Sequence, residues 1–261
     1  MDILEQIILH KHKEVEERKD LYPIKLLERS IYFQTQPISL KHYVLRPDKS
    51  GIIAEFKRKS PSKGMINQYA SVEEITIGYM QAGASALSVL SDEKFFGGKN
   101  EDVTKARKVN FCPILRKEFI IDEYQIIEAK SIGADAILLI AACLSANEIK
   151  TMAKFAKSLG MEVLLELHDE DEFSKISSEI DLVGINNRNL KTFVVDIEQS
   201  KRFAAKIPDN FVKIAESGID SVEVVKDLKT HGFKGFLMGE HFMKTADPAK
   251  ACAEFIKLCN I

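Results

Sequence analysis

The chain of 261 residues has no tryptophan and only four cysteines, none of which form a Cys-x-x-Cys pair. Scattered cysteines are typical of reduced thiols in a cytosolic protein, so we expect neither a disulfide framework nor a redox pair. The six histidines are equally dispersed and lack the spacing of metal ligands. The sequence therefore predicts no metal site.

The chain also lacks an excess of one charge and a long apolar run. Its formal net charge is −2, which creates no field that would favour nucleic acid or an anionic membrane. The longest apolar run, 136–144, is too short to cross a bilayer. The first residues show no basic region followed by an apolar stretch, as a signal peptide would. We expect a cytoplasmic protein that binds neither nucleic acid nor membranes.

From residue 51 onward, short apolar segments alternate with helical patterns eight times. This repeat is typical of a (β/α)8 TIM barrel, an α/β fold of about 250 residues. The competing fold is a doubly wound open sheet, but no Gly-x-Gly-x-x-Gly motif follows the first segment. The predicted strand cores are 52–56, 86–90, 113–116, 136–140, 162–166, 182–185, 212–215 and 235–238. The predicted helices are about 72–82, 101–108, 122–132, 145–158, 170–177, 197–205, 220–230 and 247–258.

The first fifty residues differ from this repeat. Apolar residues at helical spacing predict an amphipathic helix over about 2–17, and Pro23 suggests the start of a second helix over about 23–31. We interpret 37–50 as a connecting stretch. The expected organisation is one domain over 1–261, with 1–50 as a helical extension and 51–261 as the barrel.

Several of the apolar segments end in charged residues, as expected of a barrel whose active site lies at one rim. Glu55 and Lys57 alternate at the end of the first strand, so both should point into the barrel mouth. Lys117 ends the third strand, where a partly desolvated lysine can act as a general acid. Glu166 ends the fifth and can accept a proton, with His168 as the alternative base.

Other strand ends carry groups suited to an anionic substrate. Four cations lie within 57–63, which predicts an anion-binding rim, although a solvated basic loop is the alternative. Asn186 follows the sixth strand as an uncharged donor and acceptor, and Arg188 is expected at the rim. The last two strands end in the turns 217–218 and 239–240, where backbone N–H groups can hold a phosphate.

These segments resemble the indole-3-glycerol phosphate synthase family, in the order that the family has them. The matching segments are 53–62, 88–93 with Phe96 and Gly98, 115–119, 166–169, 184–190, 215–219 and 237–240. The resemblance implies a carboxy-lyase of tryptophan biosynthesis that needs no cofactor and no metal. This family converts 1-(o-carboxyphenylamino)-1-deoxyribulose 5-phosphate into indole-3-glycerol phosphate, releasing CO2 and water. The resemblance also implies that the N-terminal helices help to cover the barrel mouth.

The resemblance also implies residue roles. Lys117 would be the general acid for ring closure, Glu166 the general base, and Lys57 the group that holds the substrate carboxylate and helps dehydration. The orienting residues would be Glu55, Asn186 and Glu216. The substrate-binding residues would be Ser60, Pro61, Phe96, Phe119, Leu139, Arg188 and Leu190, of which Phe96, Phe119 and Leu139 would line an aromatic pocket. The phosphate would be held by Ser217, Gly218, Gly239 and the backbone of Glu240.

Small departures from the family pattern leave this interpretation in place. Glu240 puts a carboxylate beside the phosphate turn, so its side chain should turn away, while Ser91 and Lys99 stand where relatives often carry threonine and serine. Two other functions stay open: a lysine Schiff-base aldolase acting on a phosphosugar, and a non-catalytic barrel that binds a phosphometabolite. The expected partner is a small phosphorylated substrate, and the expected state is a monomer.

Overall fold

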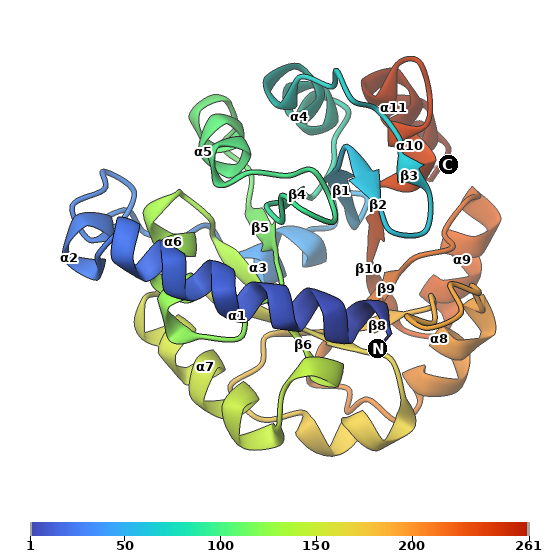
Figure 1. Ribbon diagram of the computed structural model, residues 1–261. Coiled ribbons are helices and arrows are strands. Elements are labelled where there is room, and N and C mark those ends of the chain that lie inside the picture. The colour runs from blue at the N-terminus through green and yellow to red at the C-terminus, as the bar shows by residue number, and fades with distance from the viewer. Residues whose placement is uncertain (1, 260–261) are drawn as a thin grey trace.

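The structure, a computed structural model, describes residues 2–259 and contains a closed barrel of eight parallel strands (Figure 1). The predicted TIM-barrel fold is therefore confirmed, and seven of the eight strands begin and end within one residue of the predicted positions. The barrel order is β1-β10-β9-β8-β7-β6-β5-β4. The strands are β1 (Ile52–Phe56), β4 (Ala86–Leu90), β5 (Ile114–Lys117), β6 (Ala136–Ile140), β7 (Glu162–Leu167), β8 (Leu182–Asn186), β9 (Val212–Glu216) and β10 (Phe233–Met238).

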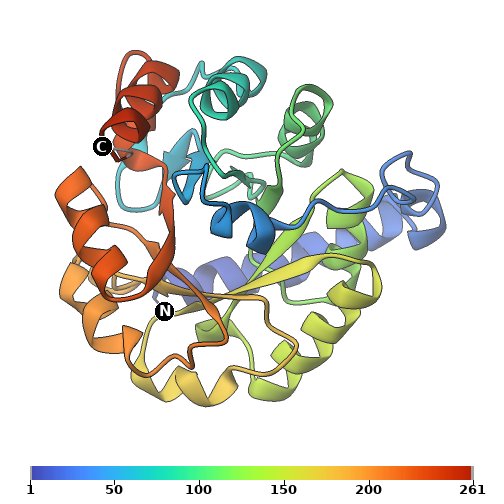
Figure 2. The same cartoon turned by 180° about the vertical axis from the view of Figure 1, so that it is seen from behind.

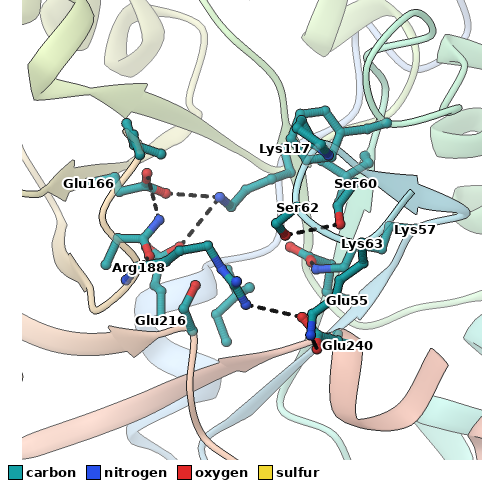
Figure 3. Close-up of a pocket in the computed structure, with 18 of the residues that line it drawn as sticks. Glu55, Lys57, Ser60, Ser62, Lys63, Lys117, Glu166, Arg188, Glu216 and Glu240 are labelled. Carbon is teal, nitrogen blue, oxygen red and sulfur yellow. Dashed lines mark hydrogen bonds and ion pairs between the residues drawn. The ribbon is translucent and has the colours of Figure 1, made fainter. Parts of the chain in front are cut away.

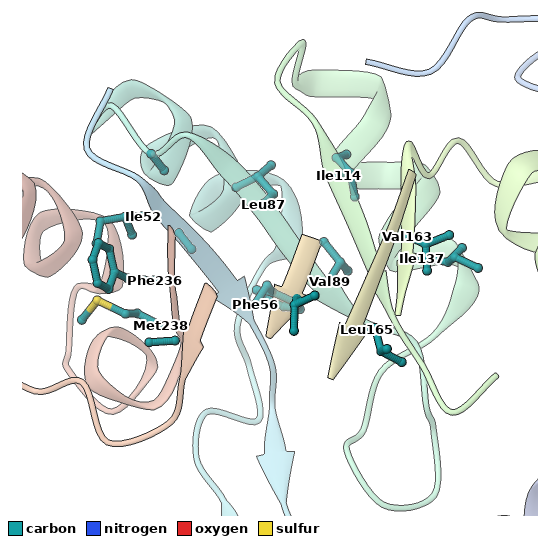
Figure 4. Close-up of a cluster of buried hydrophobic side chains, with 14 of the residues drawn as sticks. Ile52, Phe56, Leu87, Val89, Ile114, Ile137, Val163, Leu165, Phe236 and Met238 are labelled. Atoms are coloured by element: carbon teal, nitrogen blue, oxygen red, sulfur yellow. The ribbon is translucent and has the colours of Figure 1, made fainter. Parts of the chain in front are cut away.

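Two apolar layers explain why the strands are hydrophobic on both faces. Side chains that point inward fill the barrel, among them Ile53, Leu164 and Ile214. Alternate side chains point outward and pack against the helices, as Figure 4 shows for residues such as Phe56 and Val163. Because both faces are buried, these strands show no simple polar–apolar alternation.

A helical segment follows every strand of the barrel. These segments are α4 (Val72–Gln81), α5 (Asn100–Val109), α6 (Glu123–Ser131), α7 (Ala146–Ser158), η2 (Glu170–Lys175), α8 (Ile197–Ala204), α9 (Val222–Thr230) and α11 (Pro248–Cys259). The segment η2 is a 3-10 helix and not the predicted α-helix. The short elements β2 (Lys59–Ser60), β3 (Gly64–Met65), η1 (Ala141–Cys143) and α10 (Glu240–Met243) were not predicted.

The N-terminal extension covers both ends of the barrel. Helix α1 (Ile3–Leu21) runs across one face in Figure 1, followed by the short α2 (Ile24–Leu27). The stretch 37–50, predicted as a connection, contains α3 (Leu40–Leu45), which lies near the middle of the opposite face in Figure 2. Leu40 and Val44 of α3 pack with the inward-pointing side chains, so α3 closes the bottom of the barrel. No helix within residues 2–259 is long and apolar enough to span a membrane.

Candidate active site

A cavity of about 540 Å³ opens at the carboxyl ends of the strands. Strand register brings the charged ends to a similar level: Leu90 pairs with Lys117, Ile140 with Glu166, and Asn186 with Glu216. A volume of this size suits a small-molecule ligand. With one exception, every predicted site residue lines this cavity.

Lys117 lies between two carboxylates inside the mouth (Figure 3). Its Nζ is 2.9 Å from Glu166 Oε2 and 3.4 Å from Glu216 Oε2. Burial by itself would lower the pKa of Lys117, but Glu166, Glu216 and Glu55 together raise it. Lys117 therefore holds its proton at neutral pH and is present in the acid form that a proton donor needs.

Glu166 is surrounded by hydrogen-bond donors. Besides Lys117, its Oε1 lies 2.7 Å from His168 Nε2 and accepts from Asn186 Nδ2 at 3.1 Å. Burial would raise the pKa of Glu166, yet Lys117 and His168 hold it well below its usual range. The carboxylate is thus ionised, and His168 contacts this carboxylate at hydrogen-bond distance. Among the two candidate bases, Glu166 is the one at the centre of the cluster.

Glu216 behaves differently from Glu166. Burial and the neighbouring Glu166 charge raise the pKa of Glu216 well above its ordinary value, although Lys117 opposes them. Its Oε1 is buried and has no hydrogen-bond partner among residues 2–259. Gly184 on the adjacent strand makes room for this oxygen, since a Cβ there would lie 2.2 Å from it. Glu216 therefore takes up a proton more readily than Glu166 does.

Replacing Glu216 with glutamine should therefore lower kcat by less than about tenfold, because the amide keeps the shape of the side chain and burial already disfavours its charged form. Steady-state kinetics at pH 7 would test this expectation. Glu216→Asp is the matched variant, since it keeps the acid but withdraws it from Lys117 by one methylene. A loss in Glu216→Gln as large as that in Glu166→Gln would show that Glu216 acts as a carboxylate.

Glu55 and Lys57 form a second pair on β1. Lys57 Nζ is 2.6 Å from Glu55 Oε1, as their alternation in the strand predicts. Gly239 at the end of β10 allows this arrangement, because a Cβ at that position would lie 2.6 Å from the same oxygen. The Gly239 turn thus packs directly against the side chain that orients Lys57.

The two glycine turns after β9 and β10 lie together at one side of the cavity. Ser217 has a positive φ of 64°, rare for a residue with a Cβ, and Gly218 follows with 74°. The Asn187 amide stabilises this turn by donating to the carbonyl oxygens of Glu216 and Ser217, both at 3.1 Å. Helix α10 begins directly after Gly239.

The Glu240 side chain forms ion pairs with two cations at the rim. Its Oε2 is 3.0 Å from Arg188 NH2, and its Oε1 is 3.4 Å from Lys63 Nζ. These two contacts hold the carboxylate of Glu240 at the rim. Lys63 was predicted only as part of the basic loop, and the structure adds it to the cavity wall.

An apolar wall faces the charged groups. Phe96 and Phe119 contribute their rings, whose centroids are 5.9 Å apart. The prediction for Leu139 is wrong: its side chain belongs to the outer layer, and Leu138 and Ile140 line the cavity instead. Strand alternation is the physical reason, because neighbouring residues on β6 point to opposite faces.

Helix α1 supplies lining residues that sequence reasoning missed. Ile3, Leu4 and Ile7 border the cavity, so the extension forms part of its wall. The signal for this contact is the apolar stripe of α1, which shows that the helix packs against something but not which surface it covers. Within residues 2–259, no group of three or more His, Cys, Asp or Glu side chains is placed to hold a metal ion.

Fold and site define a (β/α)8-barrel enzyme with acid and base groups gathered at the barrel mouth. The family model for indole-3-glycerol phosphate synthase matches residues 4–255, and the chain belongs to this family. A relative named indole-3-glycerol phosphate synthase from Bacteroides thetaiotaomicron is 52% identical over 256 residues, covering 98% of each chain. A relative of the same name from Carboxydothermus hydrogenoformans is 41% identical, covering 95% of this chain and 97% of its own.

Solved structures with little sequence identity share the fold alone. A chain of the tryptophan synthase a2b2 complex from Pyrococcus furiosus has a TM-score of 0.56 at 16% identity, covering 82% of this chain and 98% of its own. The 3-hexulose-6-phosphate synthase of Salmonella typhimurium has a TM-score of 0.64 at 13% identity, covering 80% of this chain and 98% of its own. Both results agree with the TIM-barrel architecture.

Proposed function

We propose that this chain catalyses the reaction of its family, closing the ring of 1-(o-carboxyphenylamino)-1-deoxyribulose 5-phosphate to form indole-3-glycerol phosphate. The observation that carries the proposal is the position of Lys117, protonated between Glu166 and Glu216 and lining the same cavity as Phe96 and Phe119. Ring closure needs an acid, a base and an apolar place for the anilino ring, and this cavity has all three.

In the first step, the aromatic carbon that bears the carboxylate bonds to the ketone carbon. The ketone oxygen takes a proton from Lys117 and becomes a hydroxyl group. This step is difficult because it disrupts the aromaticity of the ring. The main contribution of the lysine is to stabilise the negative charge that develops on the ketone oxygen. Glu166 and Glu216 orient the ammonium for this transfer.

The later steps restore aromaticity. The carboxylate leaves as CO2 and its bonding electrons return to the ring, next to the apolar wall. The hydroxyl group then leaves as water with a proton from Lys57, and Glu166 removes a proton from the adjacent carbon. Two protons are donated and one is accepted, so each turnover takes up one proton from solvent, because the carboxylate anion leaves as neutral CO2 and the hydroxyl group leaves as water.

The phosphate is assigned to the turns at 217–218 and 239–240. Their glycines allow close backbone approach, and their N–H groups suit phosphate oxygens. Arg188 and Lys63 add positive charge at the same rim, where both contact Glu240.

The state of the lysines argues against the Schiff-base alternative. A Schiff base requires a neutral amine, whereas Lys117 is kept protonated by three carboxylates and Lys57 is paired with Glu55. Borohydride added during turnover should leave the protein mass unchanged. A mass increase equal to the reduced substrate adduct would support the aldolase.

Turnover of the synthetic anilino substrate, followed by indole fluorescence, tests the function directly. The wild-type chain should produce fluorescence and release CO2 in equal amounts. A protein that binds the substrate without forming indole would fit the non-catalytic barrel, and the proposed function would then be wrong.

Replacing Lys57 with alanine should raise KM and lower kcat together, each by roughly tenfold or more, because one ammonium holds the carboxylate and donates a proton. Steady-state kinetics measure both values. Lys59→Ala is the matched control, since the Lys59 ammonium donates to the carbonyl of Lys94 and does not line the cavity. An unchanged KM in Lys57→Ala would contradict the carboxylate contact.

Three further properties belong to the proposal. We expect a cytoplasmic enzyme, a monomer, and one domain whose helical extension is part of the same folding unit as the barrel. The third expectation is supported by α1 and α3, which pack on opposite ends of the barrel. Light scattering would measure the mass in solution, and a dimer would contradict the monomer.

A further inference from the structure

Lys11 of α1 is a buried lysine outside the acid–base cluster. Its side chain is 0% exposed, and its Nζ lies 3.0 Å from carboxylate oxygens of Glu14, Asp92 and Glu118. Burying an ammonium costs free energy unless several acceptors compensate its charge. Attaching the helix to the barrel surface would not by itself require a buried lysine. Two of these partners, Asp92 and Glu118, belong to loops of the barrel mouth and so connect α1 to the site.

Asp92 and Glu118 also hold the backbone of the aromatic wall. Asp92 Oδ1 accepts from the N–H groups of Phe95 at 2.6 Å and Phe96 at 3.1 Å. Glu118 Oε1, the oxygen that faces Lys11, accepts from the N–H of Phe119 at 2.9 Å. One ammonium therefore neutralises both carboxylates that position the two phenylalanine rings.

A second connection from α1 reaches the residue on the other side of Lys117. Arg18 of α1 pairs with Glu128, and Glu128 pairs with Arg116 at 2.6 Å. These links attach α1 to both neighbours of Lys117, namely Arg116 and Glu118.

The Ser91 hydroxyl joins the two connections. It accepts from Arg116 Nε at 3.0 Å and donates to Glu118 Oε2 at 2.6 Å. The network therefore runs without a break from Arg18 through the strand end to Lys11. A shift of α1 would therefore move the backbone on both sides of Lys117, the proposed acid.

We propose that Lys11 is a positioning residue that couples the N-terminal helix to the placement of Lys117 and of the Phe96–Phe119 wall. This inference rests on the proposed function. It assigns α1 a part in the chemical step, in addition to the apolar cover that Ile3 and Ile7 provide. Misplacing a catalytic group by about 1 Å can cost roughly 10²-fold in rate, so a helix that sets this position has a large effect.

Lys11→Met is the first test, because methionine fills a similar volume without the charge. We expect kcat to fall roughly 10- to 100-fold. Inorganic phosphate is the probe for the opposite rim: its inhibition constant should stay within about twofold, because the turns after β9 and β10 are not part of the network. Rates are compared at temperatures where circular dichroism shows each variant fully folded.

Lys19→Met is the matched control. Lys19 lies on the same helix and also forms an ion pair with the barrel, 2.8 Å from Asp122, but both side chains are about one-third exposed. Its kcat should equal that of the wild type. A kcat for Lys11→Met within twofold of the wild type would overturn the proposal.

The double variant Lys11→Met/Glu118→Gln separates positioning from simple stability. It removes one positive and one negative charge, so it keeps the net charge of the wild type and should be destabilised less than Lys11→Met if the uncompensated carboxylates are the cause. Measured against Glu118→Gln alone, positioning by Lys11 predicts that kcat of the double variant is lower while thermal stability recovers. Recovery of kcat together with stability would show that Lys11 only neutralises buried charge. If the wild type itself forms no indole, the proposed function is wrong. This result differs from both results of the double variant, so the two proposals can fail separately.

Discussion

Lys117→Met is expected to lower kcat for indole formation by about 10²–10⁴-fold, the usual cost of losing a positioned acid. Methionine has a similar length, so the barrel mouth keeps its shape but loses the proton that Lys117 holds between Glu166 and Glu216. Single-turnover fluorescence measures the effect, because it separates the chemical steps from product release.

Lys213→Met is the matched control for this variant. Lys213 is also a buried lysine on a barrel strand, but its Nζ donates to the Ala204 carbonyl at 2.8 Å and does not line the cavity. Its kcat should stay near the wild-type value. Inhibition by inorganic phosphate should survive in Lys117→Met, since the turns proposed to bind phosphate follow other strands. A kcat near the wild-type value in Lys117→Met would remove this residue from the mechanism.

Glu166→Gln is expected to lower kcat by about 10²-fold or more, mainly in the steps that need a proton acceptor. Glutamine keeps the shape and some hydrogen bonds of the carboxylate but cannot take a proton. In the proposed mechanism ring closure depends on Lys117, so the first step should partly survive and a non-indole intermediate should accumulate. Rapid quenching followed by mass spectrometry would detect this intermediate.

His168→Asn distinguishes the two candidate bases. His168 lies 2.7 Å from Glu166, so its loss should change the pH dependence of the reaction and leave most of kcat. Burial lowers the pKa of His168, but contact with Glu166 outweighs it and raises the pKa. His168 therefore holds a proton more readily than an ordinary histidine, which favours Glu166 over His168 as the proton acceptor. Full activity in Glu166→Gln with none in His168→Asn would make His168 the base.

Much of the site is predictable because strand ends in a barrel converge. Glu55, Lys117 and Glu166 lie far apart in the sequence, but parallel strands bring their carboxyl ends to one rim. Leu139 shows where this reasoning fails. Strand β6 is apolar on both faces, so no alternation indicates which residues point inward, and the structure selects Leu138 and Ile140.

The sequence alone determined the barrel, the order of its strands along the chain and the charged groups at their ends, because burial and alternation are local properties. Tertiary structure decided how these groups act on each other. The pKa of Glu216 is raised by burial and by Glu166, a residue fifty positions away, and its oxygen fits only because Gly184 stands beside it. Lys11 looks like an ordinary charged residue of an amphipathic helix until packing buries it between Asp92 and Glu118. Charge depends on environment, and environment is set by contacts between residues that are distant in the sequence.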